Sequence, residues 1–318
     1  MRKFIFQTTL FITIAILAIT ALLLSTNRIV DRKAGFVIAS NIDKIVVGHS
    51  HPECAFNDSL ITNFRNFAQS GESYFYTYYK ILPLLRQNKQ ISTVFIEFDN
   101  NRLVQTVDEL IWESRYISYQ YPDYGAFFDE EGNKLLFRKN WKSFLNSQTL
   151  LLRKNLEAIE TGDFDFTKKA GRYIYLERNQ TDSILAARKK NPAPITGSKP
   201  SAASKNLYYL EKLILACREN NRKVYLIRSP LHPEFDGLKN EDFFQQIRRS
   251  RFGDTEFLDF KDFPLANSEF GNLEHLNFRG ARKFSTFFNK LLQDSLLRKK
   301  DKQEFINDAM LKLTGGSQ

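Results

Sequence analysis

The stretch from Phe4 to Leu24 is the feature that most constrains the fold, because it holds no charged residue. Its length of about 21 residues, at about 1.5 Å per residue in a helix, spans the roughly 30 Å hydrocarbon core of a bilayer. The threonines within it are tolerated, since a threonine hydroxyl in a helix can bond to a carbonyl of the preceding turn. The sequence therefore predicts a transmembrane anchor over residues 1–27, followed by a connector over residues 28–42.

A cleaved signal peptide is the alternative interpretation of this stretch, because Arg2 and Lys3 provide the positive charge with which such peptides begin. The apolar run is longer than a usual h-region, and no clear A-x-A cleavage site follows Leu24. Both features favour an anchor that is kept. Basic residues flank both ends of the run, so the positive-inside rule does not decide its orientation.

The net charge of +10 arises partly from basic clusters at residues 188–190 and 298–302, and no nucleic-acid-binding motif accompanies them. We expect these charges to face solvent, anionic lipid or an acidic polymer, and we expect no nucleic-acid partner. Cys54 and Cys217 could pair in an oxidising compartment, but Cys217 lies on an apolar helical face and is typical of packing. Neither cysteine indicates a metal site.

Apolar strands that alternate with helices dominate the rest of the chain. The runs Lys44–Gly48, Ser92–Phe98 and Lys223–Ile227 predict buried strands, and Phe257–Phe260 predicts a short fourth strand. Helices are expected over residues 57–67, 74–86, 207–217 and 280–297. This alternation predicts an α/β fold with a parallel, doubly wound sheet.

An aromatic-rich, mostly helical stretch from Leu103 to Lys190 interrupts this alternation. We interpret residues 103–204 as an insertion or lid with its linker, because residues 188–204 hold three prolines and many small residues. The main domain then covers residues 43–297, and residues 298–318 form a basic tail.

Two of the four histidines flank a serine in the segment Val47-Gly48-His49-Ser50-His51, directly after the first predicted strand. A serine at a strand-to-helix turn is well exposed for nucleophilic attack, and the N-terminus of the following helix favours a developing negative charge. Backbone N–H groups there can also stabilise an oxyanion. The alternative role for Ser50 is that of a helix N-cap, and for His51 that of a residue in the first helical turn.

A third histidine, His275, precedes the last predicted helix in the segment from Gly271 to Ala281. A histidine in a loop that leads into a helix can reach into a cleft and act as a general base. The alternative is a hydrogen-bonding role at the start of that helix.

Together these segments resemble the SGNH (GDSL-like) hydrolase superfamily, in particular its membrane-linked branch associated with O-acetylation of envelope polysaccharides and D-alanylation of teichoic acids. The resemblance extends over nearly all of the body outside residues 103–204. It implies a three-layer, flavodoxin-like parallel sheet that carries the helical insertion and follows one transmembrane helix. It also implies Ser50 as the nucleophile and His275 as the general base.

The second and third sequence blocks of that superfamily supply donors to the oxyanion hole. The resemblance implies Gly71, in the segment Asn66–Ser73, and either Asn100 or Asn101, which follow the second predicted strand. These donors would act together with the Ser50 amide.

Two positions depart from the superfamily pattern. His49 stands where an aspartate usually precedes the serine, and Asn272 stands at the aspartate of the D-x-x-H motif. In a serine protease, replacing the triad aspartate by asparagine costs about 10⁴ in rate. Three alternatives follow: a Ser–His dyad oriented by a backbone carbonyl, a substitute carboxylate, or a domain that retains only binding. The candidate substitutes are Asp259, Asp262 and Glu274.

Arg228 and His232 follow the third predicted strand, at the strand end where α/β folds place ligand contacts. We predict a substrate contact for either residue, with a solvent-exposed turn position as the alternative. Glu97 and Asp99, at the end of the second strand, are candidates for the same role. The many Phe and Tyr side chains can line a sugar-binding surface, although most residues of these types belong to cores.

The sequence and the resemblance thus predict a membrane-anchored serine esterase or O-acyltransferase that acts on a cell-envelope glycan or acyl ester. The resemblance places the body outside the cytoplasm and implies a multi-pass membrane acyltransferase as a partner. No metal or organic cofactor is implied. The alternative is a catalytically inactive, SGNH-like module that binds glycan or acts as a scaffold in an envelope acylation complex.

Overall fold

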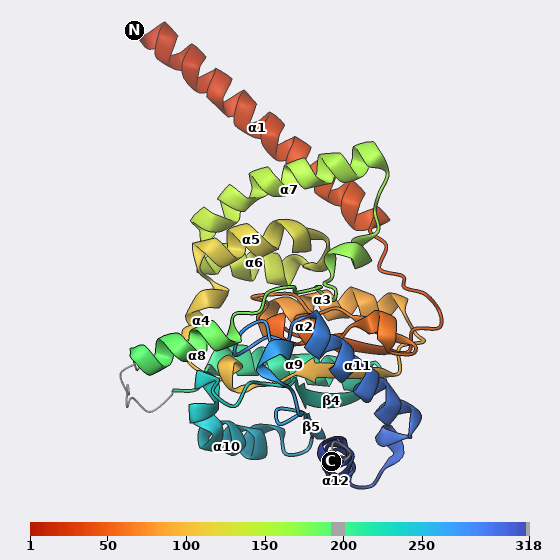
Figure 1. Ribbon diagram of the computed structural model, residues 1–318. Helices are drawn as coiled ribbons and strands as arrows, with labels where there is room; N and C mark the ends of the chain where they lie inside the picture. The colour runs from red at the N-terminus through yellow and green to blue at the C-terminus, as the bar shows by residue number, and fades with distance from the viewer. Residues whose placement is uncertain (192–200, 316–318) are drawn as a thin grey trace. The chain divides into compact units, whose positions relative to one another are not determined.

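The computed structural model describes residues 1–191 and 201–315, which form two compact units (Figure 1). The smaller unit consists of residues 1–37 and 112–169, and the larger unit consists of the remaining described residues. Residues 192–200, which belong to the linker expected in the insertion, lie outside the described part of the chain.

Helix α1 (Arg2–Lys33), in the smaller unit, is long and apolar enough to cross a membrane. Its most apolar window is 0% buried against the described residues of the protein. The helix continues beyond the anchor expected at residues 1–27, so the connector expected at residues 28–42 is helical as far as Lys33. At about 1.5 Å per residue it extends for roughly 48 Å, which exceeds the thickness of the hydrocarbon core.

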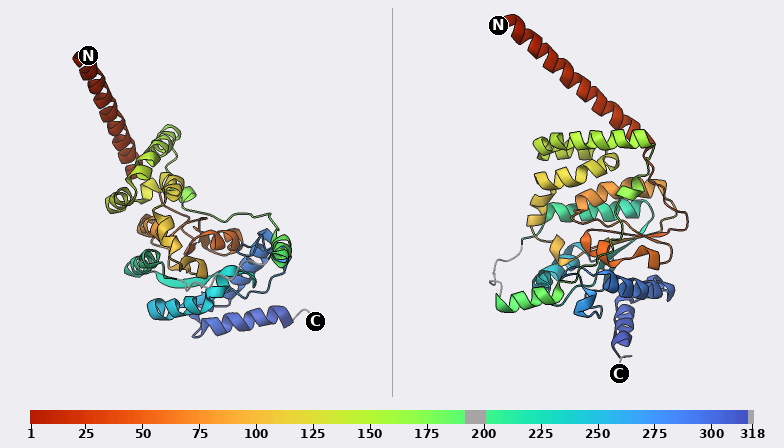
Figure 2. Two further views of the ribbon diagram at one scale, coloured as in Figure 1. Left: turned by 90° about the vertical axis from the view of Figure 1, so that its left-hand side faces the viewer. Right: turned by 45° about the horizontal axis from the view of Figure 1, so that its top comes forward.

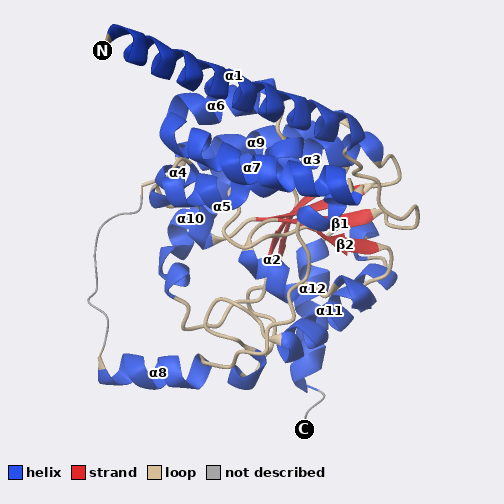
Figure 3. Ribbon diagram, turned by 90° about the horizontal axis from the view of Figure 1, so that it is seen from above, coloured by secondary structure: helices blue, strands red, loops and turns tan. Residues whose placement is uncertain are grey.

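Three further α-helices belong to the described part of the smaller unit, and all lie within the expected insertion. They are α5 (Ser114–Tyr124), α6 (Glu130–Lys139) and α7 (Trp141–Thr161). Helix α7 packs against α5 and crosses the C-terminal part of α1, as Figures 1 and 3 show. The side chain of Asn140 begins α7, because its Oδ1 accepts a hydrogen bond of 3.1 Å from the Ser143 N–H.

The larger unit holds a five-stranded sheet in the order β2-β1-β3-β4-β5, and every strand pairs with its neighbours in parallel. The α/β fold with a parallel sheet, predicted from the alternation of strands and helices, is therefore confirmed. The strands are β1 (Lys44–Val47), β2 (Phe64–Asn66), β3 (Thr93–Glu97), β4 (Lys223–Arg228) and β5 (Phe257–Asp259).

The helix predicted over residues 57–67 is wrong. A single 3₁₀ turn forms at Asp58–Leu60, and the edge strand β2 follows at Phe64–Asn66. A strand of three residues is too short to show an alternating pattern, and its conformation depends on pairing with β1, where Lys44 lies opposite Phe64. Tertiary pairing, which the local sequence does not encode, decides this segment.

Helices cover both faces of the sheet (Figures 2 and 3). On one face, α2 (Ser50–Ala55) packs with α11 (Phe278–Gln293) over a core rich in phenylalanine. On the other, α3 (Tyr74–Gln87) packs with α9 (Ser204–Glu219). The remaining α-helices of this unit are α4 (Thr106–Ile111), α8 (Thr181–Lys190), α10 (Glu241–Phe252) and α12 (Lys302–Gly315), the last of which lies in the expected basic tail.

The position of β1 between β2 and β3 brings two distant segments together. From β1 the chain first adds β2 on one side and then β3 on the other. Ligands of open α/β sheets bind beyond the carboxyl ends of the strands at such a change of direction. β1 leads into His49 and Ser50, and β3 leads into Asp99, so the topology places these residues at one edge of the sheet.

Gly48 allows the ends of β1 and β3 to approach each other. Its φ is +146°, a conformation that residues with a side chain rarely adopt. A Cβ atom at this position would lie 2.6 Å from the Cβ of Glu97. A glycine is therefore needed directly before the turn that carries Ser50.

We expect the substitution Gly48→Ala to lower the free energy of unfolding by about 2–4 kcal/mol, because backbone strain and overpacking act together. A matched control is Gly162→Ala, since Gly162 has φ +70° but no atom within 4 Å of its added Cβ. That control should cost only about 1 kcal/mol. Denaturant unfolding monitored by circular dichroism measures both, and equal losses would contradict the close approach at Gly48.

Candidate active site

Ser50 and His275 are in direct contact. Ser50 begins α2, directly after β1, and His275 lies in the loop before α11. The Nε2 atom of His275 lies 2.7 Å from Ser50 Oγ, although the two residues are 225 positions apart. Both residues are partly exposed. The structure therefore brings together the two residues predicted to be nucleophile and base.

Asn272 orients the ring of His275. Its Oδ1 atom lies 3.0 Å from His275 Nδ1, and it also accepts the backbone N–H groups of Glu274 at 2.9 Å and His275 at 2.8 Å. An amide nitrogen cannot accept these bonds, so the atom that faces the ring is the oxygen. The proton of the neutral ring then sits on Nδ1, and Nε2 presents its lone pair to the Ser50 hydroxyl.

None of the candidate substitute carboxylates takes over this role. Asp259 pairs with Arg228, with its Oδ1 accepting from Nε at 2.9 Å, and Asp262 pairs with the adjacent lysine. Glu274 lies closer to the site, but its Oε2 faces His51, with 3.7 Å to Nε2. The geometry shows an oriented Ser–His pair, but the ring is held by the side chain of Asn272 and not by a backbone carbonyl, as the first alternative had it.

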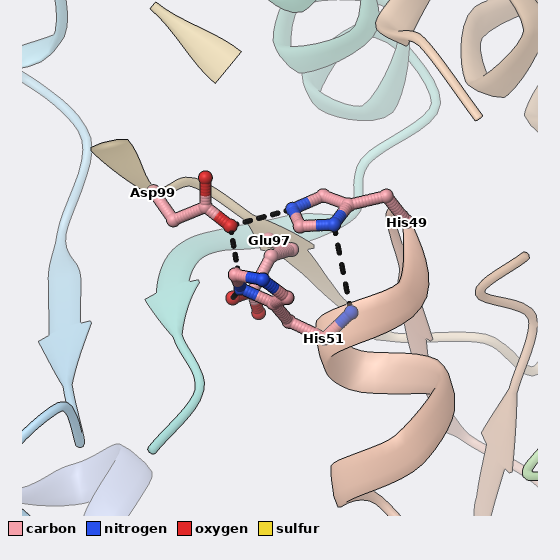
Figure 4. A group of neighbouring side chains, drawn as sticks. All are labelled: His49, His51, Glu97 and Asp99. Carbon is pink, nitrogen blue, oxygen red and sulfur yellow. Dashed lines mark hydrogen bonds and ion pairs between the residues drawn. The ribbon is translucent and has the colours of Figure 1, made fainter. Parts of the chain in front are cut away.

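Four buried polar side chains, His49, His51, Glu97 and Asp99, form a cluster beside Ser50 (Figure 4). One carboxylate oxygen of Asp99 lies 2.5 Å from His49 Nε2 and 2.8 Å from His51 Nδ1. Glu97 contacts His51 only at 3.9 Å and accepts hydrogen bonds from the backbone and hydroxyl of Ser229. Asp99 thus holds both histidines that flank the serine.

Burial and the charges of neighbouring side chains shift the pKa values of these four groups in different directions. Burial raises the pKa of Asp99, but the two histidines outweigh it and hold that pKa well below its ordinary value. Burial alone would lower the pKa of His51, yet Asp99 and the more distant glutamates raise it to about 9. Burial lowers the pKa of His49 to about 3 and raises that of Glu97 to about 8. At neutral pH the cluster therefore holds one ion pair, between Asp99 and His51.

The charge of His51 in this ion pair contributes to the lowered pKa of His275, the predicted base. Burial, with the positive charge of His51 as the next cause, lowers the pKa of His275 to about 4. The two imidazole rings lie edge to face, with 5.4 Å between their centroids. The Glu274 carboxylate opposes the effect of His51 on this pKa. His275 is therefore unprotonated over most of the pH range, as a general base must be, but it is a weak base.

Two groups of residues offer ligand atoms of the kinds that bind metal ions. The four side chains of the buried cluster form one group, and His51, Glu274 and His275 form the other, with ligand atoms within 4.8 Å of one another in each. Two ligands on one tetrahedral zinc ion lie about 3.3 Å apart. The 2.5 Å and 2.8 Å contacts of Asp99 are shorter, which favours shared protons over a shared ion.

Arg228 and Asn100 belong to a second buried network. The Arg228 side chain is 0% exposed and donates to Asp259, Glu241 and Asn100. The amide nitrogen of Asn100 in turn donates to Glu241 at 2.9 Å. We therefore interpret Arg228 as a structural residue that holds strand ends together, whereas a substrate contact was predicted. Both the oxygen and the nitrogen of the Asn100 side-chain amide form hydrogen bonds within the same network.

Asn101 lies closer to the catalytic loop than Asn100 does. Its Nδ2 donates to Glu274 Oε2 at 3.3 Å, and its backbone N–H donates to Asp99 at 2.8 Å. Gly71 has φ +73° and lies in the turn after Gln69, whose N–H donates to the carbonyl of Gly48. This bond connects the turn that holds Gly71 to the residue before His49.

His232 supports the loop that carries His275. Its backbone N–H donates to the carbonyl of Leu273 at 3.2 Å, and its Nε2 lies 3.1 Å from Asn267 Oδ1. The other ring nitrogen accepts the N–H of Glu234 at 3.1 Å. Both nitrogens thus have partners within the protein, and we interpret His232 as a positioning residue where the sequence suggested a substrate contact.

The joint role of His49, His51 and Asp99 was missed at the level of sequence. Their positions offered one signal: a carboxylate after β3 and histidines after β1 lie at neighbouring strand ends whenever β1 and β3 pair. The pairing of these strands, however, is a property of the fold. The sequence suggested a first-turn helical role for His51, and it does lie in the first turn of α2.

Comparisons with known proteins leave the family open. The model of an uncharacterised family matches residues 164–297, which is less than half of the chain but includes β4, β5 and the loop of His275. No curated protein matches the sequence.

The buried cluster predicts how stability changes with pH. The pKa of His51 is raised from 6.5 to about 9 and that of Glu97 from 4.5 to about 8, so the folded state binds more protons than the unfolded state above pH 6.5. Stability should therefore fall as pH rises from 6.5 to about 9, by at most about 1.4 kcal/mol per pH unit for each group.

The Glu97→Gln variant should show a shallower decline over this interval, because it removes one of the two groups. The exposed Glu304→Gln is the control and should follow wild type. Thermal unfolding in detergent micelles at several pH values measures the effect. A Glu97→Gln curve parallel to that of wild type would mean that Glu97 ionises normally in the folded protein.

Proposed function

We propose that this chain is a membrane-anchored serine esterase or O-acyltransferase of the SGNH type that acts on cell-envelope glycans. The observation that carries the proposal is the 2.7 Å contact between Ser50 Oγ and His275 Nε2. A second contact of the His275 ring strengthens this observation. Asn272 holds Nδ1, so the basic nitrogen Nε2 points toward the Ser50 hydroxyl.

The topology supports the superfamily assignment. The strand order β2-β1-β3-β4-β5 is the flavodoxin-like order of doubly wound sheets. The serine follows β1 and the histidine precedes the last helix that covers the sheet, as the SGNH pattern requires. Fold alone does not define chemistry, so the proposal rests on the contacts of the two side chains.

In the proposed reaction, Ser50 Oγ attacks the carbonyl carbon of an acyl ester while its proton passes to His275 Nε2. The bond to the alcohol then breaks, and that alcohol leaves with the proton from His275. A sugar hydroxyl or water next attacks the acyl-serine ester, gives its proton to the same nitrogen, and releases Ser50. Asn272 accepts the Nδ1–H bond throughout, which preserves the ring orientation.

The oxyanion would be held by backbone donors near the start of α2. The Ser50 N–H and Gly71 are the candidates, since the turn of Gly71 is bound to Gly48 through Gln69. Of the two candidate asparagines, Asn101 is better placed than Asn100, because it contacts Glu274 beside His275.

The envelope location rests on α1 and on the superfamily resemblance. A helix of this length and hydropathy at the N-terminus suits an anchor, and the membrane-linked SGNH branch works outside the cytoplasm. The reaction described above consumes activated acyl groups at the outer face of the membrane but does not form them. We therefore propose a multi-pass membrane acyltransferase, which would deliver these groups, as the partner.

Asn272 favours a second candidate function, that of an inactive SGNH-like module that binds envelope glycan. A neutral amide stabilises an imidazolium less than a carboxylate does, and the pKa of His275 is already lowered to about 4. In that case the site would hold an acylated sugar without cleaving it.

Covalent labelling distinguishes the two functions. We expect a fluorophosphonate probe to label the full-length protein at Ser50, and Ser50→Ala to abolish the labelling. His275→Ala should slow it by about 10²–10⁴, the usual contribution of a general base. Ser59→Ala, which alters an exposed serine, is the matched control. A folded wild-type protein that resists labelling would favour the binding module.

The Asn272→Asp variant tests whether the missing charge limits the rate. A carboxylate can accept the same three N–H bonds, and it would stabilise the imidazolium by about 1–2 kcal/mol more than the amide, which is about a tenfold gain in esterase rate. The added charge should also raise the pKa of His275 and move the acidic limb of the pH–rate profile upward.

Asn272→Ala should lower the rate and is the control for loss of orientation. Hydrolysis of a small acetyl ester as a function of pH gives both quantities. If Asn272→Asp left rate and profile unchanged, His275 would not be the base.

A further inference from the structure

Helix α7 has an apolar stripe that the smaller unit does not cover. Trp141, Leu145 and Leu156 are 52%, 49% and 43% exposed, while Leu152 and Ile159 are partly exposed. At about 100° per residue these five positions fall within about 60° of the helix circumference. They form the α7 stripe, defined as Trp141, Leu145, Leu152, Leu156 and Ile159.

The face of α7 next to the stripe accounts for its packing within the unit. The ring of Phe144 packs at a tilt against Tyr121 of α5, with 5.0 Å between the ring centroids, and Lys154 pairs with Asp123 of the same helix. The fully buried positions of α7 are Ser143, Ser147, Gln148, Leu151, Asn155 and Ala158. The helix therefore packs within this unit through a face of mostly polar and small residues, and the apolar stripe beside it is left partly exposed.

The contact with α1 sets the height of α7 above the proposed membrane span. Asn155 Nδ2 donates to Asn27 Oδ1 at 2.6 Å. Asn27 lies three residues beyond Leu24, which is about 4.5 Å along the helix axis. If the apolar run ends at the hydrocarbon boundary, α7 lies in the headgroup layer, where interfacial helices insert their apolar faces to a depth of about 5–10 Å.

The orientation of α7 within its unit agrees with this height. In Figure 1, α5 and α6 lie on the side of α7 away from the N-terminal end of α1. At about 100° per residue, the α5 contacts Phe144 and Lys154 lie about 90° and 170° around the helix from the centre of the stripe, so the stripe faces away from α5 and toward the membrane side. Exposed hydrophobic surface of this extent on one helix marks an interaction site.

The charges around the stripe suit an anionic lipid surface. Lys142 and Arg153 lie on the adjacent exposed face of α7, and Arg138 and Lys139 end α6 directly before it. Tryptophan at such a position is typical of the membrane interface. Glu157 and Glu160 follow near the end of α7 and set the limit of this basic region.

We propose that the α7 stripe inserts into the headgroup region of the bilayer that α1 crosses, with lipid as its occupant. The proposal rests on the anchor in the proposed function, not on its chemistry. It gives the smaller unit a second membrane contact, so that α1 is prevented from swinging freely.

The test uses full-length protein in vesicles of phosphatidylcholine and phosphatidylglycerol. Leu145→Cys and Leu156→Cys, labelled with an environment-sensitive NBD fluorophore, probe the stripe. Asn146→Cys and Glu157→Cys probe the neighbouring exposed positions on the polar side of α7 and are the matched controls. The natural cysteines, Cys54 and Cys217, are buried, and mock labelling of wild type measures their background.

We expect a blue-shifted emission at both stripe positions, quenched by a nitroxide near the headgroup end of the lipid chains, and neither effect at the controls. A blue shift without quenching by the lipid nitroxide would overturn the proposal, since protein would then cover the stripe. Emission typical of water would overturn it as well. Alkaline carbonate extraction of the same vesicles tests the α1 anchor independently of the α7 stripe. Release of the chain from the vesicles would refute the anchor itself.

Discussion

The buried Asp99 carboxylate is the interaction on which the geometry of the candidate site depends. A carboxylate that is removed from water requires a positive partner or strong hydrogen bonds, and the protonated His51 ring supplies the charge. The same oxygen contacts His49. Because these histidines lie on both sides of Ser50, satisfying Asp99 also holds the turn that presents the serine, and it ties the end of β3 to the start of α2.

This arrangement has a chemical consequence for the base. The cation that stabilises Asp99 lies beside His275 and lowers its pKa, which works against the imidazolium that forms when Ser50 loses its proton. Asn272 orients the His275 ring but carries no charge. Its oxygen is held in place by two backbone N–H groups. The site therefore combines a well-oriented base with weak basicity.

The strands β1, β3, β4 and β5 could be predicted from sequence because each is an apolar run between turn residues, whereas β2 is too short to give a pattern. The pair of Ser50 and His275 could be predicted only through the order of motifs, since no local signal joins residues 225 positions apart. The role of Arg228 could not be predicted. A basic residue at a strand end suggests ligand contact, and only tertiary packing brings carboxylates to it.

The length of chain between α1 and β1 limits how far the candidate site can lie from the membrane. Helix α1 ends at Lys33 and β1 begins at Lys44, so about ten residues separate them, and these span at most about 35 Å when fully extended. Ser50 follows β1 directly. If α1 is the proposed anchor, so short a connection keeps the candidate site near the membrane. In the proposed function, an acyl donor embedded in the bilayer would lie within reach of a site held at this distance, whether the acyl group then passes to a sugar or to water.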